Sequence, residues 1–116
     1  MTAIGADRLM VWQALSELFL DTDVDASFDQ VAAQLARSGY TPDQVNSVLW
    51  LEVYPVLHHN LRSMVGEWAG WTDAFLLEHL NARPFAPCEP VRGSVGAEVA
   101  RCWSEVRSRW AALAKL

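Results

Sequence analysis

Residues 41–57 read TPDQVNSVLWLEVYPVL, and this stretch indicates a helical fold. Thr41 and Gln44 have the spacing of a helix capping box, and Pro42 occupies the first helical position, where its missing amide proton costs nothing. Apolar residues then recur at steps of three and four, which is the period of a helix with one buried face. Pro55 disfavours helix at the residue before it, so either one long kinked helix or two shorter helices fit this stretch.

The same signals outline the rest of the chain. Ser27 and Gln30 form a second predicted capping box, Gly39 is placed to end a helix in the left-handed conformation, and Thr72 is placed to cap a later helix. Pro84, Pro87 and Pro90 with Gly93 predict an extended loop over residues 84–93. The expected helices cover about residues 7–20, 27–38, 41–65 with or without a break, 73–82 and 94–115.

No part of the chain alternates between apolar and polar residues for long enough to predict a strand. The 116 residues, 52% of them hydrophobic and 20% charged, suit one folded domain and exclude extensive disorder. We therefore expect residues 1–116 to form a single compact all-α domain of five or six helices, packed as an irregular or orthogonal bundle. Apolar runs fall short of the ~18 residues of a membrane span, and the start lacks a secretory pattern, so we expect a cytoplasmic protein with no membrane contact.

The formal net charge of −5 is distributed unevenly. Residues 1–57 carry eight acidic and two basic side chains, whereas residues 58–116 carry six and seven. This balance argues against nucleic acid as a partner, although Arg101, Arg107 and Arg109 lie beside Trp103 and Trp110 in the last predicted helix. An acidic half either attracts a basic protein or only keeps a small protein soluble.

Four aspartates resemble the start of a calcium-binding loop: Asp21, Asp23, Asp25 and Asp29. The pattern then fails, because the turn position that needs glycine holds Ala26 and the bidentate glutamate position holds Ala32. No metal and no cofactor are expected. Together with Glu17, these four aspartates instead give a candidate surface for a basic protein partner.

The six tryptophans are many for so short a chain. Most should lie in the core, but Trp50, Trp68 and Trp71 place apolar bulk on more than one side of their segments. We expect these three residues to contribute to an exposed patch that binds a protein partner or a second copy of the chain.

Glu52 and Glu67 are the acidic residues most deeply set in apolar sequence. Buried carboxylates either act as acids and bases in a pocket or accept hydrogen bonds from a helix end or an arginine. The pocket alternative groups these two residues with Asp21 and Asn60 as the site of a small enzyme or ligand-binding protein.

Three motifs resemble a family of small bacterial all-helical proteins of unassigned function. They are LSELFLDT over residues 15–22, EVYP over residues 52–55 and GEWAGW over residues 66–71. The resemblance covers about residues 8–80 and implies a helical domain with no known chemistry.

No phosphate-binding glycine loop, serine elbow or cysteine–histidine signature occurs, so no catalytic residue is assigned. Small size, an acidic half and surplus aromatic residues favour a non-enzymatic protein-binding domain. Its most concrete form is an immunity protein that inhibits a bacterial toxin by occlusion. The alternative is the small enzyme or ligand-binding protein described above.

Overall fold

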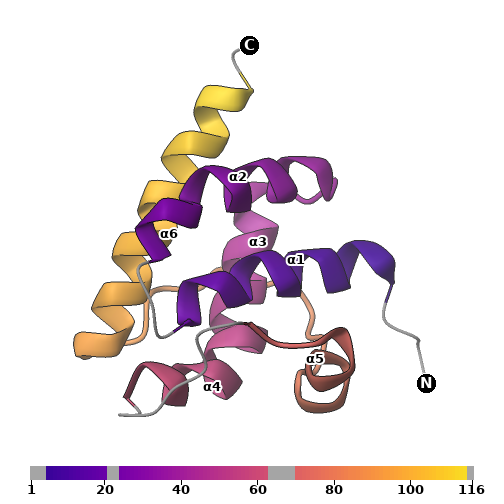
Figure 1. The fold of residues 1–116 in the computed structure, drawn as a ribbon, viewed down its shortest axis with the longest axis vertical. Helices are drawn as coiled ribbons and strands as arrows, with labels where there is room; N and C mark the ends of the chain where they lie inside the picture. Colours follow the sequence, from indigo (N-terminus) through magenta and orange to yellow (C-terminus); the bar gives the residue numbers. More distant parts are fainter. Residues whose placement is uncertain (1–4, 21–23, 63–69, 115–116) are drawn as a thin grey trace.

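Four helices surround the core of the protein, which we describe from a computed structural model covering residues 5–20, 24–62 and 70–114 (Figure 1). They are α1 (Ala6–Ser16), α2 (Phe28–Arg37), α3 (Pro42–Val48) and α6 (Ser94–Leu113). The other helical segments are η1 (Glu17–Phe19), η2 (Val24–Ser27), η3 (Leu49–Val53), α4 (Tyr54–Leu57), η4 (His58–Arg62) and α5 (Asp73–His79). The described residues contain no strand, and the predicted all-α single domain is confirmed.

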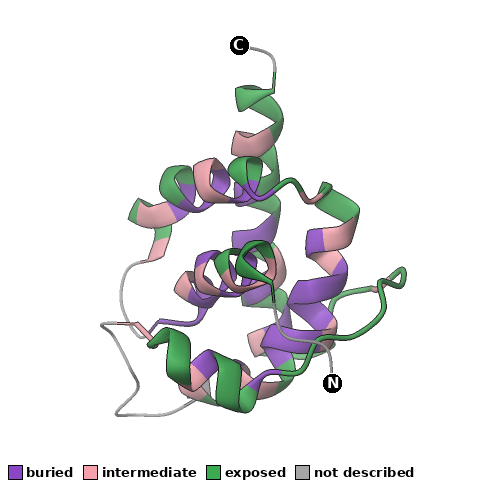
Figure 2. Cartoon of the chain, turned by 90° about the vertical axis from the view of Figure 1, so that its right-hand side faces the viewer, coloured by how far each residue is buried: buried purple, intermediate pink, exposed green. Residues whose placement is uncertain are grey.

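One continuous core lies between these helices (Figure 2). Helix α6 packs mainly against α2, and its C-terminal end extends beyond the rest of the molecule (Figure 1). Residues 81–93 are exposed along their length except for the half-buried Cys88 (Figure 2). The largest fully buried side chains include Trp12, Leu15, Phe19, Phe28, Leu35, Leu49 and Leu76.

Two of the predicted helix starts have the capping bonds that their sequences indicate. The backbone amide of Gln44 donates to Thr41 Oγ1 at 3.2 Å, and the backbone amide of Thr41 donates to Gln44 Oε1 at 2.9 Å. Together these two bonds form the capping box of α3. Thr72 Oγ1 accepts from the Phe75 amide at 3.1 Å at the start of α5. These local bonds explain why short sequence patterns were sufficient to place both starts.

The capping box predicted at Ser27 is wrong. The hydroxyl of Ser27 donates to the carbonyl of Val24 at 2.7 Å and makes no side-chain cap for α2. The cause is the 3₁₀ turn η2, which precedes α2 directly and brings the Val24 carbonyl within reach of the hydroxyl. Helix α5 also ends three residues earlier than expected, at His79.

The chain stays helical from Pro42 through Arg62, which decides between the alternatives left open at Pro55. A π-helical turn, η3, lies directly before the proline. Such a turn bonds each amide to the carbonyl five residues back, and this wider winding relieves the contact between a proline ring and the carbonyl four residues earlier. Pro55 is therefore accommodated by a local change of winding, without a break between two helices.

Across the described ranges, none of the helices combines the length and the apolar character that a membrane span requires.

Candidate binding groove

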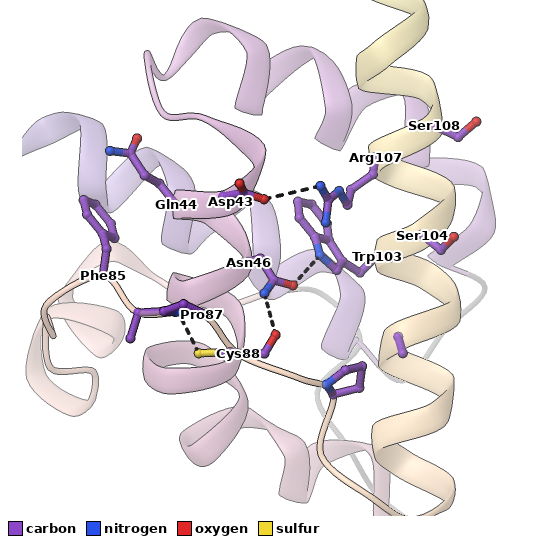
Figure 3. A pocket seen from close by; sticks show the side chains of 13 residues that line it. Asp43, Gln44, Asn46, Phe85, Pro87, Cys88, Trp103, Ser104, Arg107 and Ser108 are labelled. Carbon is purple, nitrogen blue, oxygen red and sulfur yellow. Dashed lines mark hydrogen bonds and ion pairs between the residues drawn. The ribbon is translucent and has the colours of Figure 1, made fainter.

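A groove of about 1010 Å³ runs between α3 and α6, with the segment from Phe85 to Pro90 as its third side (Figure 3). We call it the α3–α6 groove. Six of its lining residues are apolar, namely Phe85, Ala86, Pro87, Pro90, Ala100 and Trp103. The polar lining residues are Asp43, Gln44, Asn46, Cys88, Ser104, Arg107 and Ser108.

Asn46 connects the three sides of the groove through its side-chain amide (Figure 3). Its Oδ1 atom accepts from the indole N–H of Trp103 at 3.0 Å and from that of Trp50 at 3.2 Å. Its Nδ2 atom donates to the carbonyl of Cys88 at 3.0 Å. One polar side chain thus positions α6 and the 85–90 segment relative to α3.

The extended segment before α6 is bound to the helices at two further points. Ser47 Oγ accepts from the Ala86 amide at 3.0 Å, and Glu52 Oε2 accepts from the Arg83 amide at 3.1 Å. Arg8 Nη2 donates to the carbonyl of Arg83 at 2.8 Å. These bonds fix backbone groups that a helix or sheet would otherwise satisfy, so this wall of the groove is already formed without a ligand.

Glu52 is only 2% exposed, and its carboxylate accepts several hydrogen bonds. Arg8 donates to both oxygens, from Nε to Oε1 at 3.0 Å and from Nη2 to Oε2, and Trp12 Nε1 donates to Oε1 at 2.9 Å. Burial alone would lower the pKa of Arg8, but its hydrogen bonds to Glu52 and the negative charge of that carboxylate, with a further contribution from the nearby Tyr40, together raise it. Because both oxygens are occupied, Glu52 acts as a structural acceptor in this fold.

The residues grouped in the predicted pocket do not meet in the α3–α6 groove. Neither Glu52 nor Asn60 lines it, and the Asn60 amide donates to the carbonyl of Phe19 at 2.7 Å, at the end of η1. Asp21 and Glu67 lie outside the described residues.

Aspartates of the first half of the chain face arginines of α6. Asp25 Oδ1 lies 3.0 Å from Arg101 Nη2, and Asp29 Oδ1 lies 2.9 Å from Arg109 Nε. The hydrogen bonds of Arg101 to Glu98 and Asp25 raise its pKa. Two of the acidic residues expected to meet a basic partner therefore already contact basic groups of the same chain.

The other members of the predicted acidic surface are Glu17, Asp21 and Asp23. Partial burial raises the pKa of the Glu17 carboxyl. Asp21 and Asp23 lie outside the described residues. Within the described ranges, no three His, Cys, Asp or Glu side chains are grouped as a metal site would require.

The expected surface role of Trp50 is wrong, because the indole is 4% exposed and donates to Asn46 inside the fold. Its segment is wound as a π turn, which places both Leu49 and Trp50 in the core. Trp71 is half-buried against the core, and its carbonyl accepts from Gln13 Nε2 at 3.0 Å. Trp68 lies outside the described residues.

Sequence reasoning missed Asn46 and Phe85 as functional candidates. The available signal for Asn46 was a polar residue within the apolar run that follows Thr41. A signal for Phe85 was an aromatic residue between two prolines, where no helix or strand can bury it. Phe85 is 45% exposed, and its ring meets that of Tyr40 edge-on at 5.8 Å while the Arg8 guanidinium lies 5.0 Å from its centroid.

Comparison with known families gives one match, over residues 6–116, to the family described as "Domain of unknown function (DUF7079)". Comparison with curated proteins gives no match, and comparison with solved structures gives none. The family match extends through α6, beyond the residues that the three motifs reach. It confirms the expected relationship to proteins of unassigned function: the chain belongs to the DUF7079 family.

Proposed function

We propose that the protein is a non-enzymatic protein-binding domain and that the α3–α6 groove receives a segment of its partner. The observation that carries the proposal is the groove itself, with its volume of about 1010 Å³ and its mixed lining of apolar and polar residues. Small-molecule sites usually enclose about 300–1,000 Å³ and bury most of the ligand. This groove slightly exceeds that range and is open to solvent, not enclosed, which suits a chain segment better.

The rigidity of the walls also supports the proposal. Asn46 donates a hydrogen bond to the Cys88 carbonyl, and Ser47 and Glu52 accept hydrogen bonds from the backbone amides of Ala86 and Arg83, respectively. A surface that is ordered before binding loses less conformational entropy when the partner arrives. Phe85 is then available as an exposed aromatic side chain at the rim, the residue class that often contributes most to binding energy.

Among protein-binding domains, we propose an immunity protein that acts in the cytoplasm and inhibits a toxin by occlusion. The net charge of −5 supports this choice, because an acidic inhibitor associates quickly with a basic toxin domain. Coexpression with the product of the neighbouring gene tests it, and we expect relief of growth inhibition. If that product is harmless, or stays toxic in the presence of the protein, the immunity assignment is wrong and only the broader binding proposal stands.

The groove proposal is tested by filling the groove. Ser104 is exposed and lines it, whereas Ala97 is exposed on the same helix outside it. We expect the wild type and Ala97→Trp to capture the same stoichiometric partner from a lysate of the native host, and Ser104→Trp to lose it. Far-ultraviolet circular dichroism checks that both variants are folded. Retention of the partner by folded Ser104→Trp would exclude the α3–α6 groove as the binding surface.

A further inference from the structure

The ion pairs between α6 and the first half of the chain differ in length. Asp25 and Asp29 lie at hydrogen-bonding distance from their arginines, 3.0 and 2.9 Å. The nearest oxygen of Asp43 lies 3.7 Å from Arg107 Nη2, beyond the range of a hydrogen bond. This longest contact is also the one that lies in the α3–α6 groove (Figure 3).

The side chain of Arg107 is positioned by a second contact, whereas that of Asp43 is almost fully exposed. The Arg107 guanidinium lies over the Trp103 ring, 5.6 Å from its centroid, so a cation–π contact positions it independently of Asp43. The side chain of Asp43 is 96% exposed in the first turn of α3. A ligand can therefore bind the carboxylate without disturbing the packing of α6.

Charge decides which kind of ligand group is favoured. A carboxylate approaching Arg107 would meet Asp43 beside it and a protein of net charge −5. An ammonium or guanidinium approaching Asp43 is repelled by Arg107, but the side chain of Asp43 is 96% exposed against 44% for Arg107, so the carboxylate is the more accessible member of the pair and the net negative charge adds to its attraction. Apolar surface from Phe85, Pro87 and Pro90 lines the opposite side of the same groove.

From these relationships, and resting on the proposed function, we infer the chemistry of the partner segment. The segment carries a lysine or arginine that binds Asp43, next to an apolar side chain that packs against Phe85 and Pro87. Asp43 is then a specificity-determining residue: it selects basic segments over acidic ones and contributes little to the fold.

A random dodecapeptide library displayed on phage tests this inference with the full chain. Selection on the wild type, followed by removal of peptides that still bind Ser104→Trp, leaves peptides that require the groove. We expect these to carry a basic residue within two positions of an apolar one. We expect Asp43→Asn to weaken their binding about two- to fivefold, the usual range for an exposed ion pair, and high salt to remove most of that difference.

Asp7→Asn is the matched control, because it removes the same charge at an exposed position on α1 outside the groove. It should leave peptide affinity unchanged. Groove-dependent peptides that are acidic or uncharged, or basic peptides that bind Asp43→Asn as well as the wild type, would overturn this inference and leave the proposed function standing. A library without any groove-dependent peptide would contradict the inference and also count against the groove as a site for chain segments.

Discussion

The indole N–H of Trp103 donates to the side-chain oxygen of Asn46 over 3.0 Å, and this bond joins α6 to α3 at the α3–α6 groove. The residues are 57 positions apart in the chain. The same amide binds the carbonyl of Cys88, so one side chain determines the relative position of two walls. Asn46 and Cys88 are half-buried and Trp103 is buried. Loss of one of these hydrogen bonds would therefore leave a polar group without a partner inside the protein, which costs stability.

A double-mutant cycle with Asn46→Ala and Trp103→Phe measures this bond. We expect a coupling free energy of about 0.5–2 kcal/mol in urea unfolding, since each single substitution already removes the shared interaction. Trp12→Phe provides the control, because the Trp12 indole donates to Glu52 and not to Asn46. Its effect should add to that of Asn46→Ala within ~0.5 kcal/mol. Additivity in both cycles would show that the Asn46 bond does not hold α6.

The buried carboxylate of Glu52 should be needed for stability. We expect Glu52→Gln to lower the free energy of unfolding by about 2–4 kcal/mol, because the uncharged amide leaves the Arg8 guanidinium without a buried counter-charge. Glu78→Gln is the comparison, at an exposed position, and should stay within ~0.5 kcal/mol of the wild type. A fully stable Glu52→Gln protein that has lost binding of a small molecule would instead favour the pocket alternative.

Replacement of Gly96 by alanine should destabilise the protein, although alanine is normally more favourable than glycine inside a helix. An exposed glycine-to-alanine change inside a helix commonly stabilises by about 0.5–1 kcal/mol. A Cβ atom on Gly96 would lie 1.8 Å from the Val91 carbonyl oxygen, so the backbone before α6 must shift. We expect Gly96→Ala to destabilise by about 1–3 kcal/mol. Gly5→Ala, where no atom lies within 4 Å of the new Cβ, should cost less, about 0.5–1 kcal/mol, because the only loss is the preference for glycine over alanine at the N-cap of α1.

The two thiols should differ in reactivity. Burial raises the pKa of Cys102 to about 11, whereas Cys88 is half-buried at the groove and its thiol donates to the Ala86 carbonyl at 3.2 Å. At pH 8, a thiol reagent should therefore modify one residue of the native protein, and Cys88→Ser should abolish that reaction. Rapid modification of Cys102 in folded protein would contradict the packing of α6.

The raised pKa of Cys102 also predicts a pH dependence. The folded state holds the thiol proton more tightly than the unfolded state, whose ordinary pKa is 9.0. This contribution to stability is complete below pH 9 and is lost as the pH rises toward 11. Cys102→Ala should therefore flatten the decline in melting temperature over that interval.

The sequence was most informative where local chemistry determines structure. Thr41 and Thr72 begin helices because their hydroxyls reach amides three residues ahead, and Gly39 ends α2 with φ +82° in the region that favours glycine. Ser27 also has a hydroxyl and a glutamine three residues later, as Thr41 does, but its hydroxyl donates to the preceding turn. That turn is not encoded by the capping pattern, so the two sites could not be distinguished from the sequence.

The groove could not be predicted because its walls come from distant segments of ordinary composition. Asp43, Phe85 and Arg107 come from α3, the 85–90 segment and α6, and they line one groove only in the folded chain. The uneven charge distribution suggested a basic external partner, whereas α6 supplies the basic groups that Asp25 and Asp29 contact. The charge pattern of the sequence alone therefore did not indicate whether the acidic residues contact arginines of the same chain or of a partner.

Hydrogen–deuterium exchange of the protein with and without its captured partner tests the central claim, that the α3–α6 groove is the binding surface. We expect binding to slow exchange in residues 43–47, 85–90 and 100–108 and to leave exchange in α1 unchanged. Protection confined to the surface around Glu17, Asp25 and Asp29, with the groove segments unaffected, would contradict it.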